Sequence, residues 1–156
     1  MRVVDAETLA ISLMMQHGIW YSGWEFQWDR SKRRFGVCNF SKKVIGLSIH
    51  LVLLNDEERV KDTILHEIAH AIAGPDAGHG QEWKNVCIRI GAKPETCYTK
   101  EDTVTPELKY YAVCGACGKV HERQRAFKKT VKRVSCNCQT GKNWDDRVLL
   151  EYKKRY

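Results

Sequence analysis

Residues 66–70 read His-Glu-Ile-Ala-His, a pattern whose side chains can act together only on a helix. Helical residues four apart lie on one face, about a turn apart, so both imidazoles can reach one metal ion. Neutral imidazole is a good ligand for Zn²⁺. Glu67 is rotated by about 100° around the axis and can reach a metal-bound water instead. The pattern therefore predicts a zinc site in which Glu67 takes a proton from water that attacks a carbonyl.

The residues around this pattern favour a helix over residues 56–73. Asn55 followed by Glu58 is typical of an N-cap with a capping box, and Gly74-Pro75 stops a helix shortly after His70. Apolar residues recur at every fourth position between these signals, at Val60, Ile64, Ile68 and Ile72. The alternative, two partly buried histidines on an ordinary helix, explains less of this context.

A third zinc ligand is expected because a catalytic zinc is usually held by three protein side chains. His79 follows His70 by nine residues, which lets the chain leave the helix and fold back. Its glycine neighbours, Gly78 and Gly80, permit backbone angles that other residues avoid. Glu82 is the competing ligand, although a carboxylate in the first turn of a helix is also a favourable partner for the helix dipole. We favour His79.

The remaining N-terminal sequence predicts an α+β fold. Asp5 can cap a helix over residues 6–17. Alternating aromatic residues indicate a half-buried strand near residues 24–29, and two more strands are expected over residues 33–40 and 43–48. A further helix is expected over residues 81–90. The predicted core is thus an N-terminal helix, a small three-stranded sheet, the His-Glu-Ile-Ala-His helix and one following helix.

Two cysteine pairs mark the C-terminal part of the chain. Cys114 and Cys117 have the spacing of a zinc half-site, and the pair Cys136 and Cys138, with one residue between them, follows after eighteen residues. A small module buries little apolar surface, so a bound metal would supply folding free energy. We predict a zinc ribbon with one structural zinc, whereas four buried free thiols are the alternative. His121 is a weaker backup ligand.

Charge divides the chain in the same place. Residues 1–106 hold 13 Lys or Arg and 14 Asp or Glu, and residues 107–156 hold 13 and 5, so the net charges are −1 and +8. We therefore expect a metallopeptidase core over 1–106 and a basic module over 107–156 whose partner is DNA, single-stranded or duplex. A solvated loop that aids solubility is the alternative. The expected nucleic-acid-binding residues are Arg123, Arg125, Lys128, Lys129, Lys132 and Arg133, with Phe127 as a stacking surface.

The chain has no apolar run near the ~20 residues that span a bilayer, and its first residues do not resemble an export signal. We expect a cytoplasmic protein, or a nuclear one in a eukaryote, that does not act on membranes. In a reducing compartment, seven cysteines indicate metal ligands and spare thiols. Cys38 and Cys87 are expected in the core, and Cys97 has no assigned role.

The order and spacing of several segments resemble the SprT-like proteins. The segments are residues 24–29, 34–38, 45–48, 62–71 and 78–83, and the resemblance is expected to extend to the ribbon. Eukaryotic members include Spartan, a protease that removes proteins crosslinked to DNA. The resemblance implies a zincin-like metallopeptidase core with His66, His70 and His79 as zinc ligands and Glu67 as the catalytic glutamate. The Cys136-x-Cys138 spacing departs from the usual pair.

Three functions fit these observations. The first is a zinc endopeptidase that cleaves proteins at or near nucleic acid. The second is a nucleic-acid-binding zinc-ribbon adaptor with little proteolysis, although a purely structural zinc site would not need Glu67. The third is a zinc hydrolase with a non-protein substrate. Tyr98, Tyr110 and Tyr111 are candidates for the group that stabilises the oxyanion, without a spacing argument for any of them.

Overall fold

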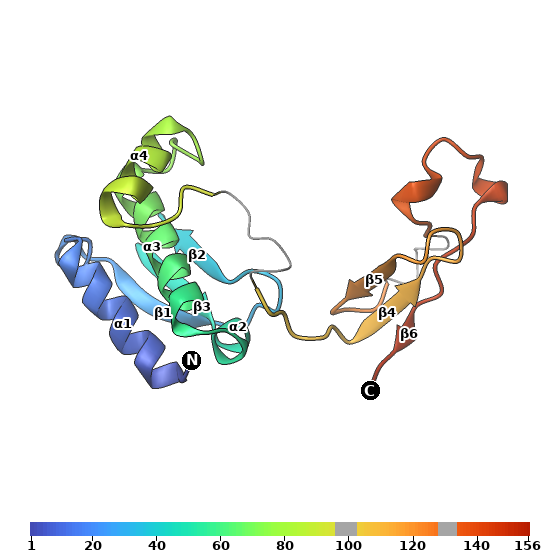
Figure 1. The fold of residues 1–156 in the computed structure, drawn as a ribbon, viewed down its shortest axis with the longest axis horizontal. Coiled ribbons are helices and arrows are strands. Elements are labelled where there is room, and N and C mark those ends of the chain that lie inside the picture. The colour runs from blue at the N-terminus through green and yellow to red at the C-terminus, as the bar shows by residue number, and fades with distance from the viewer. Residues whose placement is uncertain (96–102, 128–133) are drawn as a thin grey trace. The chain divides into compact units, whose positions relative to one another are not determined.

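The computed structural model describes residues 1–95, 103–127 and 134–156. Within these ranges the chain forms two compact units, Met1–Pro106 and Glu107–Tyr156, each with its own three-stranded sheet (Figure 1). Helices belong to the first unit, whereas the second has short strands and single 3₁₀ turns. This mixture of helices and small sheets confirms the α+β class.

The first unit contains four α-helices and three strands in the described residues. In chain order they are α1 (Val3–Gln16), the 3₁₀ turn η1 (Trp20–Ser22), β1 (Glu25–Asp29), β2 (Gly36–Asn39), β3 (Val44–Ser48), α2 (Ile49–Leu54), α3 (Glu57–Ala73) and α4 (Gln81–Ile90). The helix that carries the His-Glu-Ile-Ala-His pattern is α3. It spans nearly the whole predicted range of residues 56–73.

The sheet of the first unit has the order β1-β3-β2. β3 lies in the centre, parallel to β1 and antiparallel to β2, so that Ile45 is opposite Phe26 on one side and Cys38 on the other. All five residues of β3 are buried. β2 is an edge strand, and α3 contacts both β2 and β3. This packing brings the middle of α3 against the edge of the sheet.

The core of the first unit lies between this sheet and the helices. Val60, Ile64 and Ile68 of α3 are fully buried, as the four-residue spacing predicts, and Ile72 is half-buried at the end of the helix. Trp83 of α4 is also fully buried. Burial of such side chains contributes about 1.5–3 kcal/mol each, so this row fixes the rotation of α3 about its axis.

Both predicted helix caps are displaced from their expected positions. Asp56, not Asn55, caps α3, because the Asp56 carboxylate accepts a hydrogen bond of 2.8 Å from the Arg59 amide. The Asn55 side chain instead donates to the Leu51 carbonyl at 2.7 Å. Asp5 lies inside the first turn of α1, which begins at Val3, and does not cap it. Neighbouring polar residues at a helix start compete for one capping position, and pattern alone does not decide between them.

The helix α2, which follows β3 directly, has no counterpart among the elements predicted from the sequence. Its N-cap is Ser48, the last residue of β3, whose hydroxyl accepts a hydrogen bond of 3.2 Å from the Leu51 amide. The second strand is also shorter than the predicted range 33–40, since residues 31–34 form a turn held by the Ser31 hydroxyl. β2 therefore begins at Gly36 and enters the sheet next to the centre of α3.

The second unit is built on a sheet of order β5-β4-β6. Its elements are β4 (Tyr110–Val113), β5 (Val120–Arg123), η2 (Asn137–Gln139), η3 (Trp144–Asp146) and β6 (Lys153–Lys154). Among the described residues, its buried core consists of Ala112, Cys114, Cys136 and Leu150. Gln139 is also buried and exchanges two hydrogen bonds with the Val148 backbone, at 2.7 and 2.9 Å. A core this small leaves the unit in need of other stabilisation.

None of the helices in the described part of the chain combines the length and the apolar character that a membrane span requires.

Candidate metal sites

Three histidine side chains converge between α3 and the loop that precedes α4. The His79 Nε2 atom lies 3.1 Å from Nε2 of His70 and 3.3 Å from Nε2 of His66. His66 and His70 extend from one face of α3, and His79 returns to that face from the loop, as the nine-residue spacing permits. We call these three residues the three-histidine site.

The spacing of these nitrogen atoms fits a metal ion. Ligands at about 2.0–2.1 Å in a tetrahedron are separated by about 3.3–3.4 Å, close to the Nε2 distances in this site. Neutral imidazoles whose Nε2 atoms all point at one another also share too few protons to satisfy every contact by hydrogen bonding. A cation at the centre would resolve this arrangement, and imidazole is a ligand that zinc prefers. The site is therefore compatible with zinc.

The environment keeps two of these histidines neutral. Burial, followed by the neighbouring His70 and His79, lowers the pKa of His66 to about 3. Burial and His79 lower the pKa of His70 to about 4. The neutral imidazole is the form that binds a metal. Both side chains are thus in the ligating form throughout the neutral pH range.

Trp83 of α4 forms a wall of the three-histidine site. Its ring centroid lies 4.8 Å from that of His66, 5.2 Å from His70 and 4.6 Å from His79, and it is stacked on His70 at an interplanar angle of 25°. The indole is fully buried. It therefore restricts the rotation of the three imidazoles. The spacing of Trp83 along α4 predicts a buried side chain, but not contact with every histidine of the site.

Glu67 is buried between α3 and β2, with 9% of its surface exposed. A Cβ atom at Gly36 would lie 2.6 Å from Glu67 Oε1, so only glycine leaves room for the carboxylate there. Burial raises the pKa of Glu67 to about 7, against the opposing effects of the Arg34 charge and a hydrogen bond from the Cys38 backbone. A carboxyl group with a pKa near 7 can both accept and release a proton at neutral pH.

The three-histidine site and Glu67 open into one cleft with a volume of about 400 Å³. The edge strand β2 and the loop before α4 form its walls, so the cleft runs along the β2 side of the sheet. The other lining residues are Arg34, Gly36, Val37, Cys38, Phe40, Pro75 and Gly78. This cleft is accessible to a substrate from outside the unit.

Several other candidates lie elsewhere. Glu82, the competing ligand, is exposed in the first turn of α4 and does not belong to the three-histidine site. Cys87 is fully buried in the core, as expected, whereas Cys38 is half-buried and lines the cleft. Tyr110 and Tyr111 belong to β4 of the second unit. Cys97 and Tyr98 lie outside the described residues.

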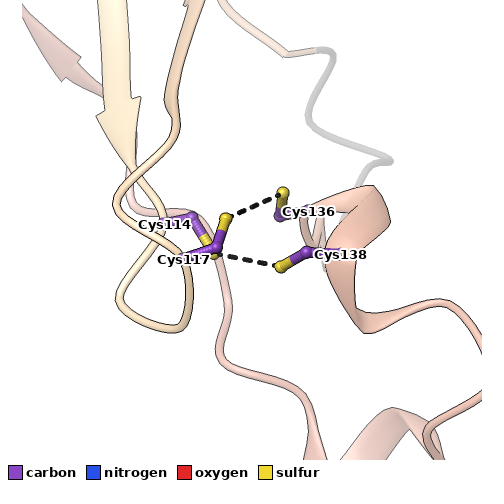
Figure 2. Close-up of side chains that lie close together, drawn as sticks. All are labelled: Cys114, Cys117, Cys136 and Cys138. Carbon is purple, nitrogen blue, oxygen red and sulfur yellow. Dashed lines mark hydrogen bonds between the residues drawn. The ribbon is translucent and has the colours of Figure 1, made fainter.

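The four cysteines of the second unit face one another, as Figure 2 shows. The Sγ atoms of Cys114 and Cys138 are 3.7 Å apart, and those of Cys117 and Cys136 are 3.8 Å apart. The four Sγ atoms all lie within 4.8 Å of one another, and His121 is not among this group. The first pair lies on the turn after β4 and the second pair at η2. We call these four residues the cysteine cluster.

The cysteine cluster has the dimensions of a tetrahedral metal site. Thiolates at about 2.3 Å from zinc are about 3.8 Å apart, whereas a disulfide would require about 2.05 Å. Hydrogen bonds from the backbone, first of all from Ala116, lower the pKa of Cys114 to about 7 and favour its thiolate. The Cys-x-Cys spacing therefore does not prevent Cys136 and Cys138 from meeting the first pair, and the cluster is compatible with zinc.

Only part of the expected nucleic-acid interface falls within the described residues. The Arg123 guanidinium lies 3.4 Å from the centroid of the Phe127 ring and donates a hydrogen bond to the Arg125 carbonyl. Phe127 is half-buried and packs edge-on against Tyr152 at 5.1 Å. The Arg123 guanidinium thus covers one face of the Phe127 ring. Lys128, Lys129, Lys132 and Arg133 lie outside the described residues.

Comparison with known proteins identifies the family of this chain. The family model described as the SprT-like family matches residues 8–103. The chain belongs to the SprT-like family. The SprT-like chain is also 30% identical over 91 residues to Protein SprT of Actinobacillus succinogenes, a match that covers 56% of this chain and 53% of that protein. The chain thus spans about half the length of this curated relative. No solved structure matches it.

The family match confirms the resemblance inferred from the sequence. It contains every residue of the three-histidine site and Glu67, and it ends before the second unit. The expected extension of the resemblance to the ribbon therefore stays a prediction. Arg34, Gly36 and Trp83 are residues of the site that motif spacing did not single out, because their contacts form only when strands and helices pack.

Proposed function

We propose that this SprT-like chain is a zinc-dependent endopeptidase with a zincin-like core, acting on proteins at or near nucleic acid. The observation that supports it most is the buried Glu67 carboxyl group beside three converging histidines in an accessible cleft. A site with structural metal alone needs neither a neighbouring carboxylate nor a cleft. We further propose a cytoplasmic location, or a nuclear one in a eukaryote.

His66, His70 and His79 would hold the catalytic zinc, and Trp83 limits the rotation of their rings. Zinc at this position would supply Lewis-acid chemistry, which polarises a peptide carbonyl and makes water more acidic. The chain itself supplies the proton acceptor. Glu67 takes a proton from the attacking water at a carboxylate oxygen and releases it to the departing amine. The raised pKa of Glu67 suits both transfers.

The edge strand β2 supports an extended peptide as the substrate. One side of β2 pairs with β3, and its other side is not paired with a strand in the described residues. β2 also contributes Gly36, Val37 and Cys38 to the wall of the cleft. A free strand edge offers backbone hydrogen bonds to an added extended segment. A protein chain bound in this way would run beside Glu67.

The second unit would hold a structural zinc at the cysteine cluster and bind DNA through its basic residues. Its net charge of +8, or about +6 with four thiolates and one Zn²⁺, supports a polyanionic partner. The alternatives are an adaptor with little proteolysis and a hydrolase of a non-protein substrate. The adaptor alternative leaves Glu67 without a role. The alternative with a non-protein substrate leaves the edge of β2 without a role.

The decisive experiment compares the wild type with Glu67→Gln on a protein substrate, with and without single-stranded and duplex DNA. Glu67→Gln keeps the shape of the side chain and the zinc content, but removes the proton acceptor. Its rate should fall by about 10²–10⁴-fold. Undiminished cleavage by Glu67→Gln would assign the chemistry to other residues. Absence of cleavage of any protein by the wild type would favour the adaptor.

A further inference from the structure

Arg34 is a cation at the cleft that the mechanism does not use. It lies between β1 and β2, two residues before Gly36, and lines the same cleft as Glu67 and the three-histidine site. Its charge acts directly on the Glu67 carboxylate. Among the described residues that line the cleft it is the sole lysine or arginine. Whatever occupies the cleft therefore meets a guanidinium on one side.

The turn between β1 and β2 holds Arg34 in a defined place. Asp29, the last residue of β1, accepts a hydrogen bond of 2.6 Å from Arg34 Nη2. The Ser31 hydroxyl accepts a hydrogen bond of 2.9 Å from the Arg34 amide, and the Ser48 hydroxyl donates to the Ser31 carbonyl at 2.5 Å. Thus both the backbone and the side chain of Arg34 are anchored to strands of the sheet.

Most of the Arg34 guanidinium is still available for a ligand. Its Nε and Nη1 groups make no hydrogen bond within the described part of the chain, and 58% of the side chain is exposed. Arginine presents five N–H donors in a planar fork whose geometry matches a carboxylate. Asp29 contacts one of these donors. An anchored guanidinium with free donors at a cleft is a suitable contact for an anionic group.

We propose that Arg34 determines specificity by binding the side-chain carboxylate of an Asp or Glu residue near the scissile bond of the substrate. This inference rests on the proposed peptidase function, in which an extended peptide lies along β2. Such a peptide would pass Gly36, which lies against Glu67 of α3, and would end near the turn that carries Arg34 in the same cleft, so one of its side chains can reach the guanidinium. A charge-assisted contact of this type is among the stronger hydrogen bonds in proteins.

The test uses zinc-loaded full-length protein and a set of peptides. Each peptide carries one Glu at a different position within four residues of a fixed cleavage site, and its partner carries Gln there. The ratio of kcat/KM for the Glu and Gln peptides is measured for the wild type and for Arg34→Gln. Arg30→Gln is the matched control, since Arg30 is an exposed residue of the same turn that does not line the cleft.

For the wild type and Arg30→Gln, we expect kcat/KM to be about tenfold higher for the Glu peptide than for the Gln peptide at one or two positions. Arg34→Gln should lose this preference. If Arg34 acted only through the charge on Glu67, Arg34→Gln would change both peptides by the same factor and keep the ratio. Equal rates for Glu and Gln peptides in the wild type would also overturn the proposal. Either result leaves the peptidase function intact.

A binding measurement separates this proposal from the peptidase function. Fluorescence anisotropy of labelled Glu and Gln peptides is measured with Glu67→Gln and with the double variant Arg34→Gln/Glu67→Gln, neither of which needs to cleave. Tighter binding of the Glu peptide by Glu67→Gln alone supports the contact even if no substrate is hydrolysed. Equal affinities for the Glu and Gln peptides in both proteins reject the contact. If a short DNA strand displaces the labelled peptides and the Glu and Gln peptides bind equally well, Arg34 would be assigned to binding phosphate instead.

Discussion

Gly36 shows how a single residue determines the position of the proposed general base. A Cβ atom there would meet Glu67 Cγ at 2.7 Å and Oε1 at 2.6 Å, distances that require Glu67 to move. We expect Gly36→Ala to retain its zinc and to lose about 10–100-fold in kcat, since small misplacements of a catalytic group are costly. Zinc analysis with steady-state kinetics checks this. Loss of zinc together with activity would instead indicate a general distortion of the site.

The raised pKa of Glu67 predicts a pH-dependent stability difference. In the zinc-free folded protein this pKa is about 7, above its ordinary value of 4.5, so folding favours the protonated carboxyl group. The contribution of Glu67 to the free energy of unfolding is therefore complete below pH 4.5, and it is lost as the pH rises through 7. Each pKa unit corresponds to 1.36 kcal/mol, so Glu67→Gln should be more stable than the wild type by up to about 3 kcal/mol at pH 8.

Thermal or urea unfolding of the zinc-free wild type and zinc-free Glu67→Gln between pH 4 and pH 8 measures this difference in stability. His66 and His70 also titrate differently in the folded and unfolded states, but they are present in both proteins and cancel in the comparison. The difference should shrink toward zero as the pH falls to 4. A difference that stays constant across this range would mean that the Glu67 carboxyl group is not responsible.

At the scale of elements, the turn between α3 and α4 completes the three-histidine site. α3 supplies His66 and His70, and the loop before α4 brings the third imidazole to them. We predict that purified wild-type protein carries about two zinc ions and that His79→Ala loses one of them. Glu82→Ala, three residues further along, is the control and should retain both. Equal zinc content in His79→Ala and the wild type would reject His79 as a ligand.

The sequence predicts the elements of the first unit better than it predicts their contacts. The four-residue period along α3 and the Gly74-Pro75 stop define that helix, because they are local signals. The parallel pairing of β1 with β3 and the contact of Gly36 with Glu67 join segments far apart in the chain. Neither contact has a local signature. The helix α2 has no clear start signal in the sequence, because Ser48 both ends a strand and caps a helix.

The same distinction applies to the site. Two histidines four apart and a glutamate between them predict a metal centre from helix geometry alone. Trp83 contacts all three imidazoles and Arg34 lines the cleft only because α4 and the β1–β2 turn pack against α3 and β2. For the cysteine cluster, the irregular Cys-x-Cys spacing left the geometry open. The 3₁₀ turn η2 now explains how both thiols of that pair face the first pair.

At the scale of the whole molecule, the two units differ in what stabilises them. In the part of the second unit that the structure describes, the core consists of four buried residues, and two of them are cysteines of the cluster, so metal binding should contribute much of its stability. We predict that Cys136→Ser loses one zinc and loses the structure of the second unit, as measured by amide hydrogen exchange. Cleavage of a short peptide by the first unit should persist. Exchange protection equal to that of the wild type would contradict a structural zinc.

Charge is the other property that separates the units, and it leads to the last prediction. The net charge is −1 for residues 1–106 and +8 for residues 107–156, with Lys128, Lys129, Lys132 and Arg133 as the densest cluster. If these residues contact phosphates, changing all four to Gln should weaken DNA binding and reduce the slope of log affinity against log salt by about 3–4. Titrations at several salt concentrations measure this slope.

A matched variant distinguishes a DNA interface from a general effect of charge. Changing four exposed cations of the first unit to Gln, at Arg30, Lys42, Lys61 and Arg89, removes the same charge from the other unit. A long-range effect of net charge would weaken binding similarly in both variants, whereas direct phosphate contacts would be lost only in the first. Neither variant should alter cleavage of a short neutral peptide, since both keep His66, His70, His79 and Glu67. If the wild type does not bind DNA even at low salt, the proposed DNA interface of the second unit is wrong, and the proposed peptidase activity stands without it.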